Sequence, residues 1–135
     1  MFLLDSCVCI DFLRGNLKKG YDLMRKSDPR LFKIPSVVQA ELLLGAAKSN
    51  NPDTNRFFVE QFFLPFDILP FDSRCAREYA SIRSYLEKEG KKIGPNDLMI
   101  ASIARAHNAV LVTHNMREFK RVPGIELEDW AEVVF

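Results

Sequence analysis

The 135-residue sequence predicts an α/β fold in which helices pack around a parallel sheet. Short apolar runs, typical of strands buried on both faces, recur along the chain and are separated by segments with helical periodicity. A strand-helix-strand unit in the C-terminal half is expected to be parallel by the right-handed crossover rule. With 47% hydrophobic residues the chain can bury a core without disulfide or metal support, so we expect one domain over residues 1–135.

The first strand is expected at residues 2–5, where an apolar run begins and then stops at the carboxylate of Asp5. This places Asp5 at the carboxyl end of a buried strand, where open α/β sheets bind their ligands. Helices are expected at residues 8–13 and 17–25, the second with a basic outer face.

A second short strand is expected at residues 31–35, followed by a helix that Ser36 opens with the spacing of a capping box to Gln39. The helix is apolar nearly all round, which predicts that it is buried. A carboxylate in such a helix, Glu41, is costly unless it is paired or binds a cation. A salt bridge or a locally exposed position is the alternative explanation.

In the middle of the chain we expect a helix at residues 53–63 and a strand at 66–69. A long helix is then expected from its cap at Asp72 to about residue 89, followed by a basic loop at 90–95. Four aromatic residues crowd one sector of the first of these helices. We interpret them as core or as a self-association surface. They are Phe57, Phe58, Phe62 and Phe63.

The next helix is expected to start at an Asn96 N-cap and to end near residue 108. Asp97 then lies in its first turn, where the helix dipole stabilises a carboxylate and lowers its pKa. Aspartate is common at such positions in any helix. Asp97 is a candidate site residue mainly because a Gly-Pro loop precedes this helix and a strand follows it. A buried strand at residues 110–113 follows this helix.

Polar residues follow that last strand, at the same sheet edge as Asp5. Thr113 and Asn115 lie in this turn, and Glu118 comes one helical turn later. His114 could be a metal ligand or a general base, but with no second histidine nearby we expect a solvent-facing loop residue. A last strand and a closing segment are expected to pack onto the sheet at residues 119–130.

Four carboxylates could thus meet at one place, without a cysteine or histidine frame around them. Such a set favours a hard divalent cation, Mg²⁺ or Mn²⁺. The empty cluster should hold one or two carboxylates with raised pKa values, and a bound cation could activate water against a phosphodiester. The four residues are Asp5, Glu41, Asp97 and Glu118.

The charge distribution fits a polyanionic partner better than the net charge of +1 suggests. Basic residues concentrate in residues 1–33, whereas only acidic residues follow Arg121. With the four acids neutralised, the remaining surface would be positive and would attract nucleic acid. A solvated mixed-charge surface is the alternative. The three cysteines form no zinc set, and no leader or membrane span is evident, so we expect a cytoplasmic protein with reduced thiols.

Several of these motifs together resemble the PIN-domain family and, more narrowly, the VapC toxins of toxin-antitoxin systems. The similarity spans essentially the whole chain, in family order. It is carried by Asp5-Ser6, by Glu41 after a Pro-Ser turn, and by residues 94–101, 113–119 and 128–130.

This resemblance implies a three-layer α/β/α sandwich around a central parallel sheet. It also implies an Mg²⁺- or Mn²⁺-dependent endoribonuclease that cuts structured RNA, most often tRNA and sometimes ribosomal RNA. A homodimer is usual in the family. A cognate VapB-like antitoxin is expected to inhibit the enzyme by placing its C-terminal segment in the active-site groove, in a higher assembly with the toxin.

By position, the acidic residues of the family correspond to Asp5, Glu41 and Asp97. Many PIN domains have another aspartate where this chain has Asn115, so either Glu118 substitutes for it or the site has three strong ligands. Ser6, Thr113 and Asn115 would be supporting hydrogen-bonding groups. The candidates for RNA phosphate contact are Lys18, Lys19, Lys91, Lys92, Arg117, Lys120 and Arg121.

Two other classes of protein were weighed against the nuclease. A haloacid-dehalogenase-like phosphatase would need a second aspartate two residues after Asp5, where this chain has Cys7. A catalytically weak PIN fold that only binds RNA or protein agrees with Asn115 but not with the joint presence of the other acids. Metal-dependent cleavage separates the nuclease from both.

Overall fold

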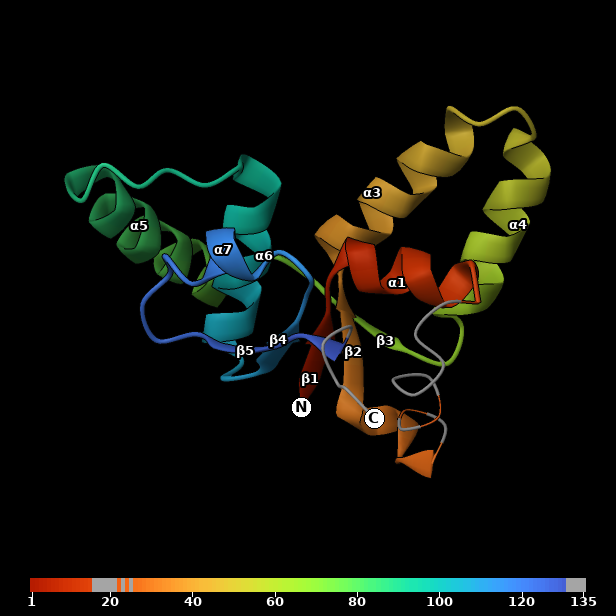
Figure 1. The fold of residues 1–135 in the computed structure, drawn as a ribbon, viewed down its shortest axis with the longest axis horizontal. Coiled ribbons are helices and arrows are strands. Elements are labelled where there is room, and N and C mark those ends of the chain that lie inside the picture. The colour runs from red at the N-terminus through yellow and green to blue at the C-terminus, as the bar shows by residue number, and fades with distance from the viewer. Residues whose placement is uncertain (16–21, 23, 25, 131–135) are drawn as a thin grey trace.

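The computed structural model describes residues 1–15, 22, 24 and 26–130 (Figure 1). Within these residues a five-stranded sheet has the order β3-β2-β1-β4-β5, and every neighbouring pair is parallel. The predicted parallel α/β fold is therefore confirmed. The strands are β1 (Phe2–Leu4), β2 (Phe32–Pro35), β3 (Asp67–Leu69), β4 (Val110–Val112) and β5 (Glu126–Glu128).

The helices form a layer on each side of this sheet (Figure 1). α1, α3 and α4 contact one another in one layer, and α5 packs on α6 in the other, with α7 beside them. This is the expected three-layer α/β/α sandwich. The helices are α1 (Ser6–Leu13), α3 (Ser36–Ala47), α4 (Pro52–Phe63), α5 (Ser73–Lys88), α6 (Pro95–Ala106) and α7 (Met116–Phe119), with a short 3-10 helix at Pro29–Leu31.

The strand order creates a topological switch point between β1 and β4. From β1 the chain first moves toward β2 and β3 and later crosses to β4 and β5. Right-handed crossovers in opposite directions place their helices on opposite faces of a sheet. The carboxyl ends of β1 and β4 therefore face a crevice between the two helical layers, which is where such folds bind ligands.

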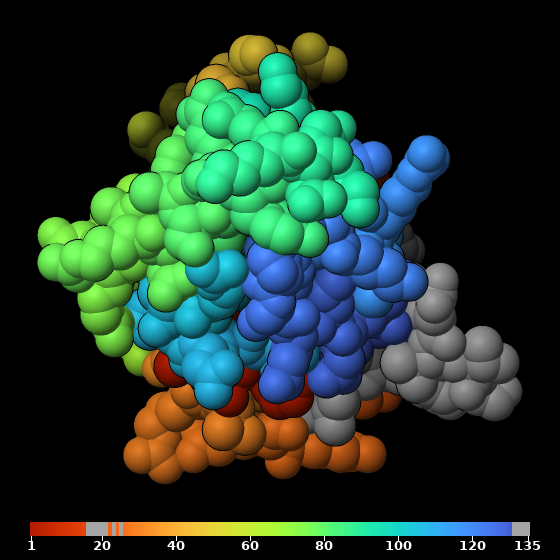
Figure 2. Space-filling view, turned by 90° about the vertical axis from the view of Figure 1, so that its left-hand side faces the viewer, coloured from red at the N-terminus to blue at the C-terminus, as the bar shows by residue number. Residues whose placement is uncertain are grey.

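The core consists of the three interior strands, β2, β1 and β4, and the inner faces of the helices. Leu3, Leu4, Leu111 and Val112 are fully buried in β1 and β4. In α5 the buried residues recur with helical spacing and face α6, as the periodicity predicted. Figure 2, which looks at this side of the molecule, shows the loop after α5 packed beside the segment that follows β4.

Two helix starts differ from the prediction. Ser36 does not form a capping box, because the N-cap of α3 is Pro35 and no side chain caps it. α6 begins at Pro95, with Gly94 as its N-cap, so the Asn96 N-cap was wrong. Proline has a fixed φ suited to the first helical position and needs no hydrogen-bond acceptor there, which moves the helix start forward.

The expectation that α3 is buried on all sides was also wrong. Val38, Leu42 and Ala46 are buried, whereas Leu44 is 56% exposed. α3 contacts α1, α4, α6, β2 and β3, yet part of its surface still faces solvent, and a hydrophobic sequence cannot report which positions have neighbours. The expected helix at residues 17–25, with Lys18 and Lys19, lies largely outside the described residues.

The aromatic sector of α4 divides between core and surface. Phe63 is buried and Phe62 is partly buried, whereas Phe57 and Phe58 are more than half exposed. α7 is a short helix that was not predicted as a separate element. No helix in the described part of the chain is both long enough and apolar enough to cross a membrane.

Replacing Ile82 by alanine tests the packing of α5 on α6. Ile82 is fully buried, so Ile82→Ala should lower the free energy of unfolding by about 2 to 4 kcal/mol in urea titrations. The control is Ser84→Ala on the exposed face of the same helix, which should change stability by less than about 0.5 kcal/mol. Equal effects of the two changes would contradict this packing.

Candidate carboxylate site at the sheet switch point

Asp5 occupies the centre of the crevice between β1 and β4. It directly follows β1, and its backbone N–H donates to the carbonyl of Val112 at the end of β4, with an N···O distance of 3.0 Å. Asp5 is also the N-cap of α1, and its side chain is only 3% exposed. The strand and the helix together determine where this carboxylate lies.

Both oxygens of Asp5 are held by neighbouring donors. Oδ1 accepts the backbone N–H of Ser6 at 2.7 Å, and Oδ2 accepts the hydroxyl of the fully buried Thr113 at 2.7 Å. Thr113 Oγ1 in turn accepts the backbone N–H of Asn115 at 3.0 Å. Ser6 and Thr113 thus each contact one oxygen of Asp5.

Glu41 reaches the same crevice from α3. Burial and the charge of Asp5 raise the pKa of Glu41, while hydrogen bonds from the side chains of Asn96 and Ser6 act in the opposite direction. Its Oε1 atom is buried and has no hydrogen-bond partner in the structure. A buried carboxylate oxygen without a donor is costly, so this atom could readily accept a cation.

Asp97 reaches the crevice from the first turn of α6. Burial raises its pKa from 3.8 to about 7, and the charge of Asp5 contributes to the rise. The hydrogen bond with Glu118 and the charges of Glu118 and Glu41 act in the same direction. The raised pKa expected for one or two acids of the empty cluster is therefore found at Asp97. The helix-dipole argument, taken alone, gave the wrong direction, because desolvation and neighbouring carboxylates outweigh the dipole.

Glu118 lies at the rim of the crevice and is already hydrogen-bonded at both oxygens. Oε1 accepts the backbone N–H of Gly94 at 2.6 Å, and Oε2 accepts Nδ2 of Asn115 at 2.8 Å. Burial acts to raise the pKa of Glu118, but the hydrogen bonds with Gly94, Asn115 and Asp97 hold it below its usual value. Glu118 thus anchors the loop that leads into α6.

Asn115 lies between two of the acids. Its Nδ2 donates to Oδ2 of Asp97 at 3.2 Å as well as to Glu118. An aspartate at this position would add a further negative charge, whereas the amide supplies a donor to two carboxylates. The structure therefore brings Asp5, Glu41, Asp97 and Glu118 into one electrostatically coupled cluster, with Asn115 bridging part of it.

His114 is not the solvent-facing loop residue that the sequence suggested. Its side chain is 25% exposed and lies between Asp11 and Asp129, which come from other parts of the chain. Sequence reasoning missed both partners, because no sequence pattern pairs either residue with His114, even though Asp129 lies in the motif at residues 128–130. The available signal was Asp11, a carboxylate in an otherwise apolar run.

The described basic candidates lie on the loop before α6 and on α7. Lys91, Lys92, Arg117 and Lys120 are exposed. Arg121 is partly buried, and its Nη1 donates to the carbonyl of Lys92 at 2.8 Å. This hydrogen bond holds the loop and α7 together beside the Glu118–Gly94 contact, so at least part of Arg121 is occupied by a structural contact.

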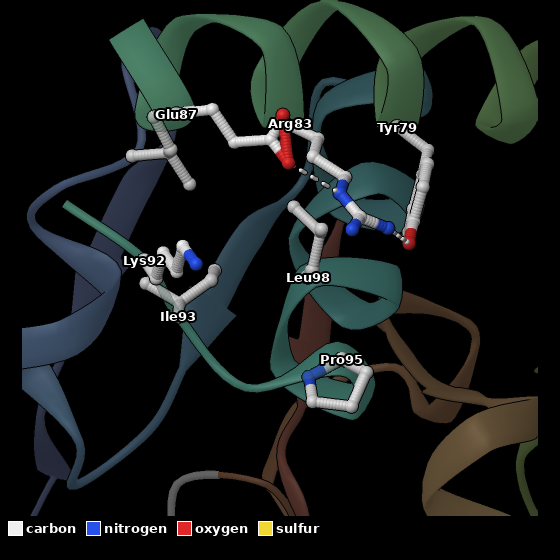
Figure 3. Close-up of a pocket in the computed structure, with 8 residues that line it drawn as sticks. Tyr79, Arg83, Glu87, Lys92, Ile93, Pro95 and Leu98 are labelled. Atoms are coloured by element: carbon white, nitrogen blue, oxygen red, sulfur yellow. Dashed lines mark hydrogen bonds and ion pairs between the residues drawn. The ribbon is translucent and has the colours of Figure 1, made fainter. Parts of the chain in front are cut away.

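A separate cavity of about 260 Å³ lies between α5, α6 and the preceding loop. Figure 3 shows the guanidinium of Arg83 at this cavity, hydrogen-bonded to Glu87 Oε1 at 3.1 Å and to the hydroxyl of Tyr79 at 3.0 Å. None of the four clustered carboxylates lines the cavity, so we do not assign it to the candidate site.

The chemistry of the carboxylate cluster fits a hard divalent cation. Glu41 has an unpartnered buried oxygen, and burial together with the neighbouring carboxylates raises the pKa of Asp97. Within the described residues no three His, Cys, Asp or Glu side chains are set in coordinating geometry. Cation binding would therefore require the carboxylates to close around the ion, which their mutual repulsion opposes in its absence.

Fold and site together define a class: a parallel α/β/α protein with a carboxylate cluster at the switch point of its sheet. The family model described as PIN domain matches residues 2–125. Ribonuclease VapC2 of Rickettsia felis is 37% identical over 133 residues, covering 96% of this chain and 98% of the relative. The tRNA(fMet)-specific endonuclease VapC of Shigella flexneri is 35% identical over 130 residues, with the same coverage of 96% and 98%.

Solved structures agree with these sequence relatives. VapBC2 from Rickettsia felis, bound to a DNA fragment from its promoter, contains a chain with a TM-score of 0.87 and 36% identity, covering 96% of this chain and 98% of that one. DNA-bound VapBC from Salmonella typhimurium gives a TM-score of 0.86 and 36% identity, covering 96% and 97%. The chain belongs to the PIN-domain family, within its VapC branch.

The pKa of Asp97 predicts how the chelator-treated protein responds to pH. Because the folded pKa is above the ordinary value of 3.8, protonation of Asp97 stabilises the fold as the pH falls through about 7. At pH 8, Asp97→Asn should therefore raise the free energy of unfolding by about 1 kcal/mol, after allowance for solvent screening. At pH 5 this gain should largely disappear.

The matched control is Asp53→Asn, because Asp53 also lies in the first turn of a helix but is exposed. This variant should not gain stability at pH 8. An Asp97→Asn protein that is less stable than the parent at pH 8, or that gains equally at both pH values, would contradict the repulsion described here.

Proposed function

We propose that this protein is the toxin of a VapBC-type toxin-antitoxin pair and acts as a divalent-metal-dependent endoribonuclease. The observation that carries the proposal is the convergence of Asp5, Glu41 and Asp97 at the switch point, where burial and the neighbouring carboxylate charges raise the pKa values of Glu41 and Asp97. Relatives with 35–39% identity over nearly the full chain are named as VapC ribonucleases or as a tRNA(fMet)-specific endonuclease. The PIN-domain match over residues 2–125 agrees with this activity, and we propose that the chain of residues 1–135 acts as one domain.

Asp5, Glu41 and Asp97 would hold the cation, which we propose to be Mg²⁺ or Mn²⁺. When bound, such an ion supplies Lewis-acid chemistry, making water a better nucleophile and offsetting charge that develops on the scissile phosphate. Thr113 fixes the orientation of Asp5 by donating to Oδ2. Ser6 donates its backbone N–H to the other oxygen of Asp5.

Glu118 and Asn115 would act mainly by holding the other groups in place. Glu118 accepts one hydrogen bond at each oxygen, from Gly94 and from Asn115, and these contacts hold it in its observed position. In its observed position it sets the loop that starts α6 and thereby the place of Asp97. Asn115 steadies Asp97 by donating to Oδ2.

We propose a structured RNA, and most specifically a tRNA, as the substrate. Two relatives are named for cleavage of tRNA(fMet), although ribosomal RNA is an alternative that the fold does not distinguish. Exposed basic residues beside the carboxylates would contact phosphates and contribute a salt-dependent affinity. These are Lys91, Lys92, Arg117 and Lys120, with a smaller contribution from Arg121.

We further propose a VapB-like antitoxin as the partner and a homodimer as the basic unit. Structural neighbours are VapBC complexes, including two that are bound to DNA. In this proposal the antitoxin places its C-terminal segment in the crevice that holds Asp5. The exposed Phe57 and Phe58 on α4 are candidates for burial in an assembly.

Cleavage of RNA tests the proposed activity. The antitoxin-free protein should cut tRNA at discrete positions in the presence of Mg²⁺ or Mn²⁺, and chelation should abolish the cuts. Asp5→Asn should lower the rate by at least about 100-fold because it removes a central charge from the cluster. Sequencing the 5′ ends of the products identifies the cut site.

The controls separate the possible outcomes of this assay. Asp53→Asn should cut at the parental rate, because Asp53 lies on an exposed turn outside the cluster. Parent protein that binds tRNA without cutting it would instead support a PIN-fold binding module. Cuts that survive both chelation and Asp5→Asn would indicate a contaminating nuclease and would contradict the proposed site.

Metal binding can also be measured without RNA. Mn²⁺ at a hundredfold excess over its dissociation constant should stabilise the fold by up to about 2.7 kcal/mol, seen as a rise in melting temperature. Asp97→Asn should abolish most of this rise, whereas Asp53→Asn should keep it. An equal rise in Asp97→Asn and the parent would show that Asp97 does not bind the ion.

A further inference from the structure

A partly buried histidine, next in sequence to Thr113 of the candidate site, bridges two carboxylates. His114 Nε2 lies 2.6 Å from Oδ2 of Asp11, and Nδ1 lies 2.9 Å from Oδ1 of Asp129. The three side chains are 25%, 26% and 9% exposed, respectively. Asp11 belongs to α1, His114 follows β4, and Asp129 follows β5, so the bridge joins three separate parts of the chain.

The chemistry of the bridge requires a charged imidazole. An imidazole can donate from both ring nitrogens only when it is protonated, and here each nitrogen faces a carboxylate oxygen. Burial acts to lower the pKa of His114, but the two carboxylates outweigh it and raise the pKa above 6.5. Cys7, whose Sγ accepts the backbone N–H of His114 at 3.4 Å, stays uncharged because its own pKa is raised to about 11.

The neighbours of His114 in sequence are the groups that orient the carboxylate cluster. Thr113 donates to Asp5 at 2.7 Å, and Asn115 donates to Asp97 and Glu118 at 3.2 and 2.8 Å. The imidazole lies between these two residues along the chain. A movement of this turn would therefore disturb three of the four carboxylates at once.

The two carboxylates of the bridge, Asp11 and Asp129, also lie on segments that contact the candidate site. α1 is capped by Asp5, and Asp11 lies six residues further along, or about 9 Å at the rise of an α-helix. The segment of Asp129 is held by the carbonyl of Glu128, which accepts the N–H of Thr113 at 3.0 Å. Trp130 then packs against Phe12 of α1, with ring centroids 6.1 Å apart.

We propose that His114 is a positioning residue for the nuclease reaction, acting through the Asp11–His114–Asp129 bridge. The bridge fixes the turn between β4 and α7 against α1 and the chain after β5. Thr113 and Asn115 then hold Asp5, Asp97 and Glu118 at the spacing that a cation and the scissile phosphate need. This role rests on the proposed function.

The bridge should also have a pH signature that follows from the sign of the shift. Because the pKa of His114 is raised in the folded protein, the stabilisation by the bridge is fully present below pH 6.5 and is lost as pH rises through the folded pKa. Above that pKa the neutral ring can donate to only one of its two carboxylates. Positioning by the bridge weakens over the same range.

The test compares His114→Gln with Arg105→Gln in the full chain, at a temperature where both are folded. Arg105 also joins separate elements, because it pairs with Glu78 of α5 and donates to the carbonyl of Pro123, but it has no contact with the site. We expect His114→Gln to lower kcat for tRNA cleavage about tenfold, with KM changed less than twofold. Arg105→Gln should keep the parental kcat.

Two further readouts separate positioning from stability alone. The ratio of kcat between the parent and His114→Gln should fall toward one as pH rises from 6 to 9, because the parent loses the bridging proton. Calorimetry with Mn²⁺ and no RNA should give a dissociation constant several-fold weaker in His114→Gln and unchanged in Arg105→Gln. Should His114→Gln fail to fold, Asp11→Asn removes one side of the bridge and should show the same trends at smaller size.

The proposal is overturned if His114→Gln keeps both the parental kcat and the parental Mn²⁺ affinity. It is also overturned if Arg105→Gln loses as much kcat, since the effect would then reflect stability. Failure of the proposed function looks different, because the parent itself would not cut tRNA. In that case the Mn²⁺ affinity decides. An affinity unchanged in His114→Gln would contradict the positioning role, whereas a weaker affinity in His114→Gln would support it.

Discussion

Repulsion among carboxylates at one edge of a parallel sheet is the constraint on which the rest of the site depends. The crossovers place Asp5 at the end of β1 and bring Glu41 and Asp97 to it from opposite helical layers. Backbone and hydroxyl donors hold Asp5, and the amide of Asn115 donates to both Asp97 and Glu118. The unpartnered oxygen of Glu41 and the raised pKa of Asp97 show that these donors do not fully offset the negative charge of the cluster.

Much of the fold could be predicted because its signals are local. Short apolar runs and helical periodicity gave the strands and most helices, and the end of the first run correctly placed Asp5 at the carboxyl edge of the sheet. The choice of Glu41 rested on the cost of a charge in an apolar helix, which is also a local argument. The resemblance to the PIN-domain family, built from motifs in order, is confirmed by the family match over residues 2–125.

The errors arose where distant residues decide the outcome. The pKa of Asp97 rises because Asp5 and Glu118 are near it, and a first-turn argument contains neither. Glu118 is held by Gly94. His114 is held by Asp11 and Asp129, which lie 103 and 15 positions away in the sequence. Periodicity cannot indicate such pairs. Nor can it show that α3 has one open side, because that depends on how the layers are arranged.

The central claim is that Asp5, Glu41 and Asp97 form a divalent cation site. An anomalous difference map from crystals grown with Mn²⁺, collected at the manganese edge, tests it most directly. The account predicts a peak among the oxygens of these three carboxylates, including Oε1 of Glu41, which has no other partner. A map with no peak there, or with Mn²⁺ held only by other groups at a concentration that supports cleavage, would contradict the account.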